Sequence, residues 1–149
     1  MTVKKSQRFS TLAELAKTKE QAAAVALGTC NRVHAENIKK LESLKQYREE
    51  YLKRLNLHGQ QGMDVSAMQT YQGFIEGLEQ AIRDQQIQII ESQQQCEQSK
   101  KIWQHVHMKT EVMNTTVDRY KKQEQYDEDH REQKEVDDRP HRKSTQQSG

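Results

Sequence analysis

The chain has 149 residues, of which 32% are hydrophobic and 31% charged, and its formal net charge is +2. The hydrophobic fraction lies below the roughly 45–50% of ordinary globular domains, which excludes a large compact core. Interspersed acids and bases exclude a basic nucleic-acid-binding face, and no stretch approaches the ~20 apolar residues of a membrane span. This profile is typical of long helices with a narrow apolar stripe or of a disordered chain, and the apolar spacing decides between them.

The first predicted helix precedes residue 56 and carries apolar residues at spacings that place them on one helix face. Extra four-residue steps between Val33 and Leu41 predict a locally straighter helix, because such steps unwind a supercoil. Ala22 and Ala26 would let a partner helix approach closely. The chain start lacks the apolar run of a signal peptide. The expected stripe consists of Leu12, Leu15, Ala22, Ala26, Cys30, Val33, Leu41, Leu44, Tyr51 and Leu55.

A turn is predicted at about residues 56–65, where the sequence reads NLHGQQGMD from residue 56 to residue 64. Gly59 and Gly62 can end one helix, and Asp64 or Ser66 can cap the next, with Ser66 and Gln69 at capping-box spacing. Short connections between long helices imply antiparallel neighbours. The sequence therefore predicts an all-α fold, a monomeric antiparallel coiled-coil hairpin of two long helices. A parallel homodimer would satisfy the same apolar spacing but would leave the glycine-containing break unexplained.

The second predicted helix follows the turn and carries about seven heptads, the signature of a left-handed coiled coil. One set of core positions contains Met68, Ile75, Ile82, Ile89, Cys96, Trp103, Thr110 and Val117. The other set contains Tyr71, Leu78, Gln85, Ser92, Ser99, Val106, Met113 and Tyr120. Gln85, Ser92 and Ser99 weaken the packing of the seam but can fix its register.

The second helix is predicted to be the longer one. A turn centred near residue 60 puts residue 10 opposite roughly residue 110, whereas the heptads continue to Tyr120. Beyond that residue the chain is charged and loses its apolar period, and Pro140 is expected to end the helix. Residues 1–139 are therefore predicted to form the hairpin, and residues 140–149 a disordered tail.

The sequence contains no phosphate-binding loop, HExxH or CxxC motif, so we predict no enzyme, cofactor or metal site. His105 and His107 project to different sides of a helix and are expected to be ordinary surface histidines. With the turn near residue 60, Cys30 and Cys96 would be offset by about 9 Å along the helix axis, too far for a disulfide. Both are expected to fill the core, which fits a reducing, cytoplasmic compartment.

The stretch TYQGFIEGLEQAI, residues 70–82, has glycines at 73 and 77 and apolar residues beside the seam. Phe74 and Ala81 widen the apolar stripe, and Tyr47 lies off the stripe of the first helix. With the turn centred near residue 60, the positions expected to gather at one level of the helix pair, near the turn, are Tyr47, Tyr51, Phe74 and Leu78. Two interpretations remain open: a locally thicker core that the glycines accommodate, or a docking site for a partner.

The sequences QYREEYLKRLN and MQTYQGFIEGLEQAI, followed by a long helix rich in glutamine and lysine, resemble the FliJ family. This resemblance implies a non-enzymatic, coiled-coil component of the bacterial flagellar type III protein export apparatus, required for motility. It implies binding to the export ATPase ring as a central stalk, to the export-gate membrane protein and to export chaperones. Its implied location is cytoplasmic, peripheral to the inner membrane at the flagellar base through partners. The alternative is a generic cytoplasmic coiled-coil scaffold or a chaperone for filament subunits.

The resemblance also implies two partner-binding surfaces. Two positions that flank the gate-binding surface, Lys40 and Gln85, differ from the residues that the family can carry there. If the paired helix ends enter an ATPase ring, exposed cations there are candidates for contact, namely Lys17, Lys19, Arg119, Lys121 and Lys122. The gate-binding surface of the family corresponds to Leu44, Tyr47, Tyr51, Phe74, Leu78 and Ala81.

Overall fold

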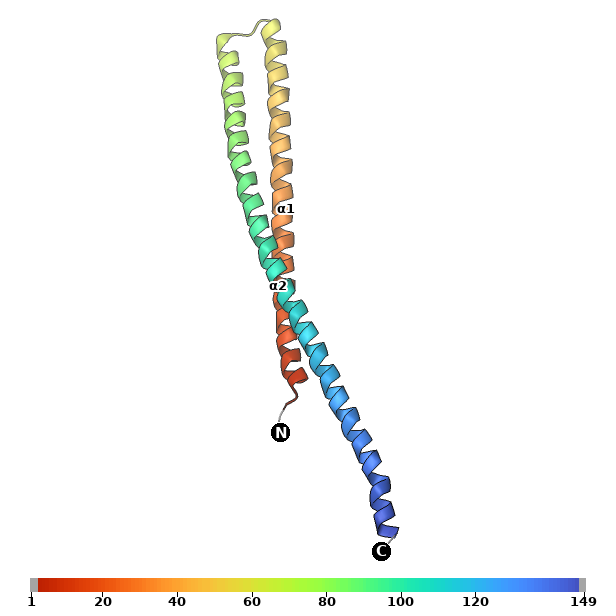
Figure 1. The fold of residues 1–149 in the computed structure, drawn as a ribbon. Coiled ribbons are helices and arrows are strands. Elements are labelled where there is room, and N and C mark those ends of the chain that lie inside the picture. Colours follow the sequence, from red (N-terminus) through yellow and green to blue (C-terminus); the bar gives the residue numbers. More distant parts are fainter. Residues whose placement is uncertain (1–2, 148–149) are drawn as a thin grey trace. The chain divides into compact units, whose positions relative to one another are not determined.

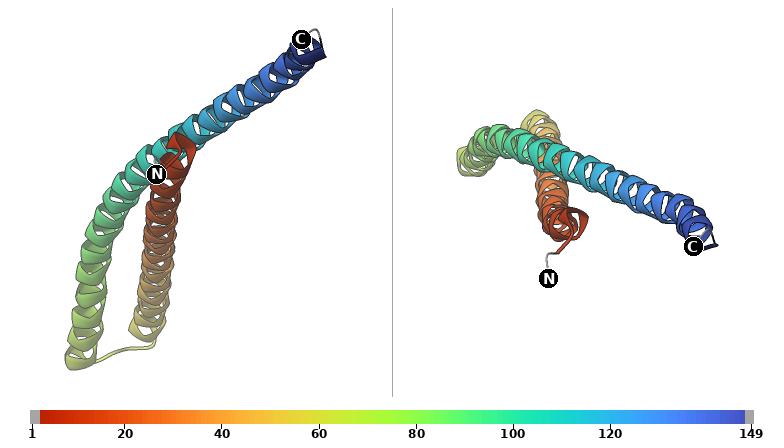
Figure 2. Two further views of the ribbon diagram at one scale, coloured as in Figure 1. Left: turned by 90° about the horizontal axis from the view of Figure 1, so that it is seen from below. Right: turned by 60° about the horizontal axis from the view of Figure 1, so that its bottom comes forward.

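The computed structural model describes the backbone of residues 3–147 and the side chains of residues 3–138. Helix α1 (Lys5–Gln60) has 56 residues and helix α2 (Val65–Gln147) has 83. Within the described backbone there is no strand. Residues 61–64 connect the two helices, as Figure 1 and the left view of Figure 2 show. The all-α prediction with a longer second helix is confirmed.

The turn is built by Gly62 and Asp64. Gly62 has a φ of 86°, a conformation that glycine adopts without a Cβ penalty, and its amide donates to the Gly59 carbonyl at 3.4 Å. Gly59 lies inside α1, so Gly62 ends the helix. Asp64 caps α2, because its Oδ1 accepts a 2.7 Å hydrogen bond from the Ala67 amide. The predicted capping box that starts at Ser66 is wrong, since Ser66 already lies in the first turn of α2.

Replacing the capping aspartate is expected to weaken the start of α2. The Asp64→Ala variant leaves the Ala67 amide without its acceptor and should lower the free energy of unfolding by about 1 kcal/mol. Thermal unfolding followed by far-UV circular dichroism measures this loss. Ser66→Ala is the matched control and should change stability by less than about 0.5 kcal/mol. An equal loss in both variants would mean that Asp64 is not the cap.

The chain divides into two compact units, and each contains a segment of both helices. Unit 1 comprises Met1–Ala22 with Gln104–Gly149, and unit 2 comprises Ala23–Trp103. In unit 2 the order of the contacts is antiparallel, because residues 30, 34 and 37 meet residues 99, 92 and 85. In unit 1 residues 6 and 20 meet residues 124 and 107. Each unit is therefore an antiparallel helix pair, as predicted.

The predicted heptad positions of α2 lie in the seam except for Met68, which is 38% exposed. Every predicted seam residue from Tyr71 to Tyr120 is buried or half-buried. The exposed fractions of Ile75, Ile82 and Val117 are only 7%, 4% and 6%. The polar residues Gln85, Ser92 and Thr110 are buried in the same row. The prediction for this helix is confirmed over those positions.

The predicted stripe of α1 is right in its second half and wrong in its first. Cys30, Leu41, Leu44, Tyr51 and Leu55 lie in the seam. Leu12, Leu15, Ala22, Ala26 and Val33 are exposed instead. The seam residues keep an even alternation of three- and four-residue steps, so the extra steps predicted before Leu41 do not occur. The residues that take the missing places are Ala13, Ala16, Glu20, Ala23, Leu27, His34, Asn37 and Arg48.

Polar residues of α1 occupy the seam because polar residues of α2 meet them there. The imidazole Nδ1 of His34 lies 2.8 Å from the Ser92 hydroxyl. The Gln85 amide donates to the Asn37 carbonyl at 2.9 Å, with the Asn37 side-chain oxygen at 3.4 Å. Each hydrogen bond offsets the cost of removing these groups from water. Because a shift of one helix would break both contacts, they fix the register of unit 2.

The two cysteines lie closer to each other than the sequence predicted. Cys30 Sγ is 3.3 Å from the Ser99 hydroxyl, one turn of α2 beyond Cys96. Desolvation raises the pKa of the Cys96 thiol, and the neighbouring Cys30 raises it further. The predicted 9 Å offset is wrong because α1 continues to Gln60, which moves the centre of the turn toward residue 62. Both cysteines are free thiols and half-buried in the seam.

The end of α2 differs from the prediction in one respect. The helix continues through Pro140 to Gln147 rather than ending at the proline. Side chains beyond residue 138 and all of residues 148–149 lie outside the described part of the chain. The disordered tail at residues 140–149 stays a prediction.

Candidate functional site

The residues that resemble a gate-binding surface all lie in unit 2, near the turn. We call them the turn-side patch: Leu44, Tyr47, Tyr51, Phe74, Leu78 and Ala81. Tyr47 and Phe74 are 53% and 54% exposed, whereas the other four are half-buried. The Tyr51 and Phe74 rings stack with their centroids 4.9 Å apart. The patch therefore joins both helices through an aromatic pair and leaves two large rings open to solvent.

The seam places the aromatic rings of the patch. Ile75, the neighbour of Phe74, is buried in the seam, so Phe74 projects beside it and rests on Tyr51. Tyr51 also lies 6.4 Å from the Tyr71 ring, measured between centroids. Leu44 and Ala81 line a shallow groove of about 370 Å³. Lys40 and Gln85, the two positions that depart from the family pattern, line the same groove.

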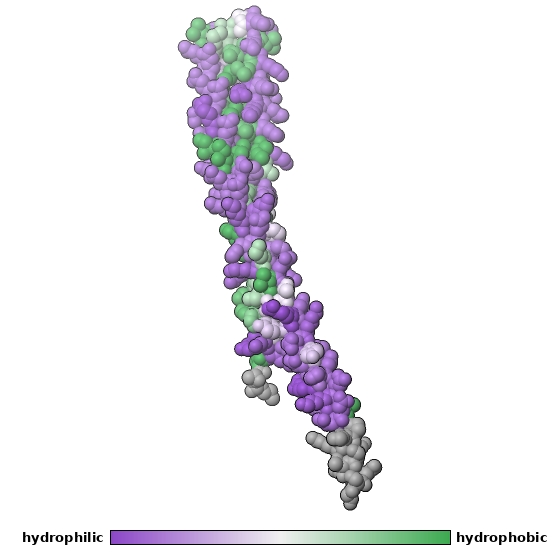
Figure 3. Space-filling model, in the orientation of Figure 1, coloured by the Kyte–Doolittle hydropathy of each residue, from purple (hydrophilic) through white to green (hydrophobic). Residues whose placement is uncertain are grey.

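The glycines of α2 do not accommodate a ring from this chain. A Cβ added at Gly73 or Gly77 would meet no atom within 4 Å. The surface over both residues is open, and Tyr47 does not fill it. The interpretation in which these glycines ease packing inside the hairpin is therefore not supported by the structure. On the face drawn in Figure 3, hydrophobic surface forms patches between hydrophilic stretches.

The cations expected at the paired helix ends lie in unit 1, but they do not form one cluster. All five are exposed. Lys17 and Lys121 line one shallow groove together with Glu14 and Asp118. Arg119 and Lys122 line another on α2, beside Tyr126. Lys19 lies on a third surface, on the other side of the seam. A partner that contacts all of them would have to surround this part of the helix pair.

His107 joins the two helices of unit 1, a role that the sequence did not reveal. Its Nδ1 lies 2.6 Å from a Glu20 carboxylate oxygen, and its Nε2 lies 3.2 Å from Glu111. The hydrogen bond with Glu20 raises the pKa of His107, and the charges of both glutamates add to this. The same hydrogen bond lowers the pKa of Glu20. The sequence predicted an ordinary surface histidine because its partner lies 87 residues away.

The stability of unit 1 should depend on pH through this pair. The raised pKa of His107 stabilises the fold fully below its ordinary value of 6.5, and the effect is lost as the pH rises through the folded value. The lowered pKa of Glu20 stabilises the fold above 4.5, and the effect is lost as the pH falls. The melting temperatures of the natural chain and His107→Gln should therefore differ most between pH 4.5 and 6.5. A difference that is constant from pH 4 to pH 9 would contradict this.

Glu124 caps the start of α1 from the other helix. Its carboxylate accepts hydrogen bonds from the Ser6 hydroxyl at 2.6 Å and from the Ser6 amide at 3.2 Å. These bonds lower the pKa of Glu124. An acid at the first turn of a helix satisfies a free amide and complements the helix dipole. The charged segment beyond Tyr120 thus contains at least one carboxylate with a structural role.

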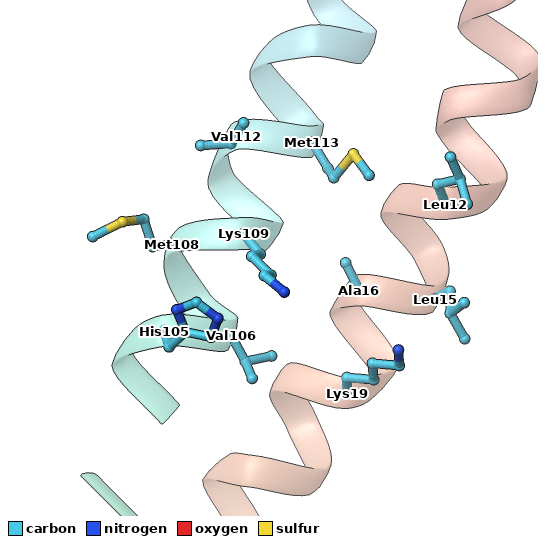
Figure 4. A pocket seen from close by; sticks show the side chains of 10 residues that line it. All are labelled: Leu12, Leu15, Ala16, Lys19, His105, Val106, Met108, Lys109, Val112 and Met113. Carbon is cyan, nitrogen blue, oxygen red and sulfur yellow. The ribbon is translucent and has the colours of Figure 1, made fainter. Parts of the chain in front are cut away.

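A second apolar surface of unit 1 was not predicted as a site. Figure 4 shows Val106, Lys109 and Met113 facing α1 and Ala16 facing α2, with Met108 and Val112 at the outer side of α2. These side chains line a groove of about 540 Å³, the lysine-rimmed groove. Its full lining is Leu12, Leu15, Ala16, Lys19, His105, Val106, Met108, Lys109, Val112 and Met113. The sequence assigned Leu12 and Leu15 to the seam, and this error hid the groove.

Within residues 3–138 no three histidine, cysteine or carboxylate side chains gather in a way that could hold a metal ion. In the part of the chain that the structure describes, neither helix contains a segment apolar enough to cross a membrane.

Comparison with known proteins gives a relationship that covers nearly the whole chain. The sequence model of the family described as Flagellar FliJ protein matches residues 5–148. The Flagellar FliJ protein of Salmonella typhi is 28% identical over 130 residues, which cover 87% of this chain and 88% of the relative. The match includes both helices, the turn and both sets of surface residues. The chain therefore belongs to the FliJ family of flagellar proteins.

Proposed function

We propose that this protein is a non-enzymatic component of the flagellar type III export apparatus. It binds the export ATPase ring as a central stalk and links the ring to the export-gate membrane protein and to export chaperones. In this role it is cytoplasmic and reaches the inner membrane at the flagellar base only through its partners. The alternative function is a generic coiled-coil scaffold or a chaperone for filament subunits.

One observation carries the proposal beyond family membership. Tyr47 and Phe74, at positions where the family binds the gate, are each more than half exposed although they are large aromatic residues. A scaffold requires only the buried seam, and it gains nothing from exposed rings next to open glycines. Aromatic side chains that project from a rigid support are the usual centres of protein interfaces. The turn-side patch is therefore assigned to the gate protein.

The helix ends of unit 1 are assigned to the ATPase. The exposed cations there face different directions around the helix pair, which suits a ring that encloses it. Contacts between exposed charges weaken as salt shortens the screening length to about 3 Å at 1 M. Apolar burial at the turn-side patch depends little on salt. The two proposed interfaces should therefore respond differently to ionic strength.

Charge reversal in unit 1 tests the ATPase assignment. Lys121→Glu combined with Lys122→Glu should weaken binding to the purified export ATPase by about tenfold or more at low salt. Gate binding should not change. Lys100→Glu with Lys101→Glu is the matched control, because it makes the same charge change on exposed residues of α2 within unit 2. Equal weakening by both pairs would point to net charge alone and would remove the support for a stalk.

A further inference from the structure

We propose that the lysine-rimmed groove of unit 1 binds an amphipathic helix of a partner protein, one with acidic residues on both sides of an apolar stripe. The groove belongs to unit 1, whereas the turn-side patch belongs to unit 2, and of the cations assigned to the ATPase only Lys19 lines the groove. The proposal concerns the apolar floor of the groove and the chemistry of its occupant, neither of which the stalk role specifies.

The apolar floor indicates that the groove is covered in an assembly. Leu12 and Leu15 of α1 are 45% and 52% exposed, and Met108 and Val112 of α2 are 66% and 59% exposed. Four large apolar side chains thus surround one depression while water reaches each of them. In a helix pair with so few buried apolar residues, this arrangement is unfavourable unless a partner contributes apolar surface.

The arrangement of these residues fits a helix better than an extended peptide. Leu12 and Leu15 are three residues apart, and Met108 and Val112 are four apart, so each pair follows its own helix axis. Ala16 keeps the floor low between the two rows. A third helix laid along the groove could place its residues at i, i+3, i+4 and i+7 between the rows, as in other helix-in-groove complexes.

The charges at the rim indicate an acidic occupant. Lys19 and Lys109 line the groove, and none of its lining residues is acidic. The nearby carboxylates of Glu20 and Glu111 are engaged by His107. The groove on the other side of the seam, in contrast, combines Lys17 and Lys121 with Glu14 and Asp118. Of these two grooves, it is therefore the lysine-rimmed groove that favours one sign of charge in its partner.

The same charges disfavour a second copy of this chain as the occupant. In a symmetric dimer the same patch of both copies meets across the two-fold axis. Lys19 and Lys109 of one copy would then lie against the same lysines of the other, and like charges across an interface are repulsive. A helix from a different protein avoids this repulsion.

A designed peptide pair tests the inference with the full-length chain. The first labelled helical peptide has leucines at i, i+3, i+4 and i+7 with flanking glutamates, and the second has lysines in place of the glutamates. Fluorescence anisotropy should show that the acidic peptide binds at least about tenfold more tightly than the basic one. Lys19→Glu combined with Lys109→Glu should reverse this preference.

The floor of the groove is tested by Leu15→Gln, which should weaken acidic-peptide binding by about tenfold or more. Val25→Gln is the matched control, because Val25 is exposed on α1 in unit 2. Equal binding of both peptides, binding of neither, or equal loss in the two variants would overturn the inference. A dimer in sedimentation that Leu15→Gln disrupts would assign the groove to a second copy instead. Binding to anionic phospholipid vesicles but to neither peptide would assign it to a membrane surface.

This assay contains no ATPase and no gate protein. Failure of the peptide test would leave the proposed stalk role intact, because that role is tested by Lys121 and Lys122. Conversely, if Lys121→Glu combined with Lys122→Glu did not weaken ATPase binding, the groove assignment would still stand.

Discussion

Ile82→Asp should destabilise unit 2 by about 3–5 kcal/mol, enough to unfold a large fraction of the chain at moderate temperature. Ile82 retains only 4% of its exposure and lies in the centre of the α2 seam. The substitution removes the branched apolar side chain and places a carboxylate at a position that is nearly inaccessible to water. Far-UV circular dichroism during thermal and urea unfolding measures the loss.

The same substitution at Ile87 is the matched control. Ile87 lies five residues further along α2 and is 55% exposed, so Ile87→Asp places its charge in water. The expected change is within about 0.5 kcal/mol. If both variants unfolded at the same temperature, helix propensity rather than seam burial would explain the effect, and the assignment of the seam would be wrong.

Tyr47→Ala combined with Phe74→Ala should weaken binding to the soluble domain of the export-gate protein by more than about thirtyfold, since central aromatic residues of interfaces often contribute 2 kcal/mol or more. Both rings are exposed, so the helix pair should remain folded. A small loss of stability is expected from the broken Tyr51–Phe74 stack, about 0.5–1.5 kcal/mol. Isothermal titration calorimetry with purified partners measures the affinity.

Val25→Ala combined with Ile90→Ala is the control for this experiment. It removes two exposed apolar side chains from unit 2 outside the turn-side patch. Gate binding should remain unchanged in this variant. If the double substitution at Tyr47 and Phe74 instead melted as early as Ile82→Asp, the two rings would belong to the core, and the patch would lose its assignment as a docking surface.

The long helix α2 could be predicted almost residue by residue because its heptads are mostly apolar. Ile75, Ile82 and Val117 recur at seven-residue multiples, and only one face of a helix can contain all of them. The polar residues at Gln85 and Ser92 could be included because apolar residues before and after them define the period. Their burial follows from position rather than from their chemistry.

The first half of α1 could not be predicted in this way. Leu12, Leu15 and Val33 are the apolar residues that a search for a stripe selects, yet they are exposed. The seam there consists of alanines, Glu20, His34 and Asn37, whose suitability depends on residues of α2 more than 45 positions away. A pattern within one helix contains no information about such partners.

The two candidate surfaces also differ in whether they can be found from the sequence alone. The turn-side patch could be found from the sequence because glycines and aromatic residues occur together in one short stretch. The lysine-rimmed groove requires the correct register of α1 against α2 before Leu15 and Met108 are seen to share a surface. Assigning Leu12 and Leu15 to the seam was sufficient to hide it.

The thin seam also determines how stability should vary with temperature. Among the residues whose burial is described, only Ala13, Ile75, Ile82 and Val117 are apolar and nearly inaccessible to water. Unfolding therefore exposes little new apolar surface, and its heat-capacity increment per residue should lie below the roughly 12–15 cal/mol/K of globular domains. A small increment flattens the curve of free energy against temperature and moves cold denaturation further below freezing. The helix pair should accordingly tolerate cooling better than a globular domain with the same melting temperature.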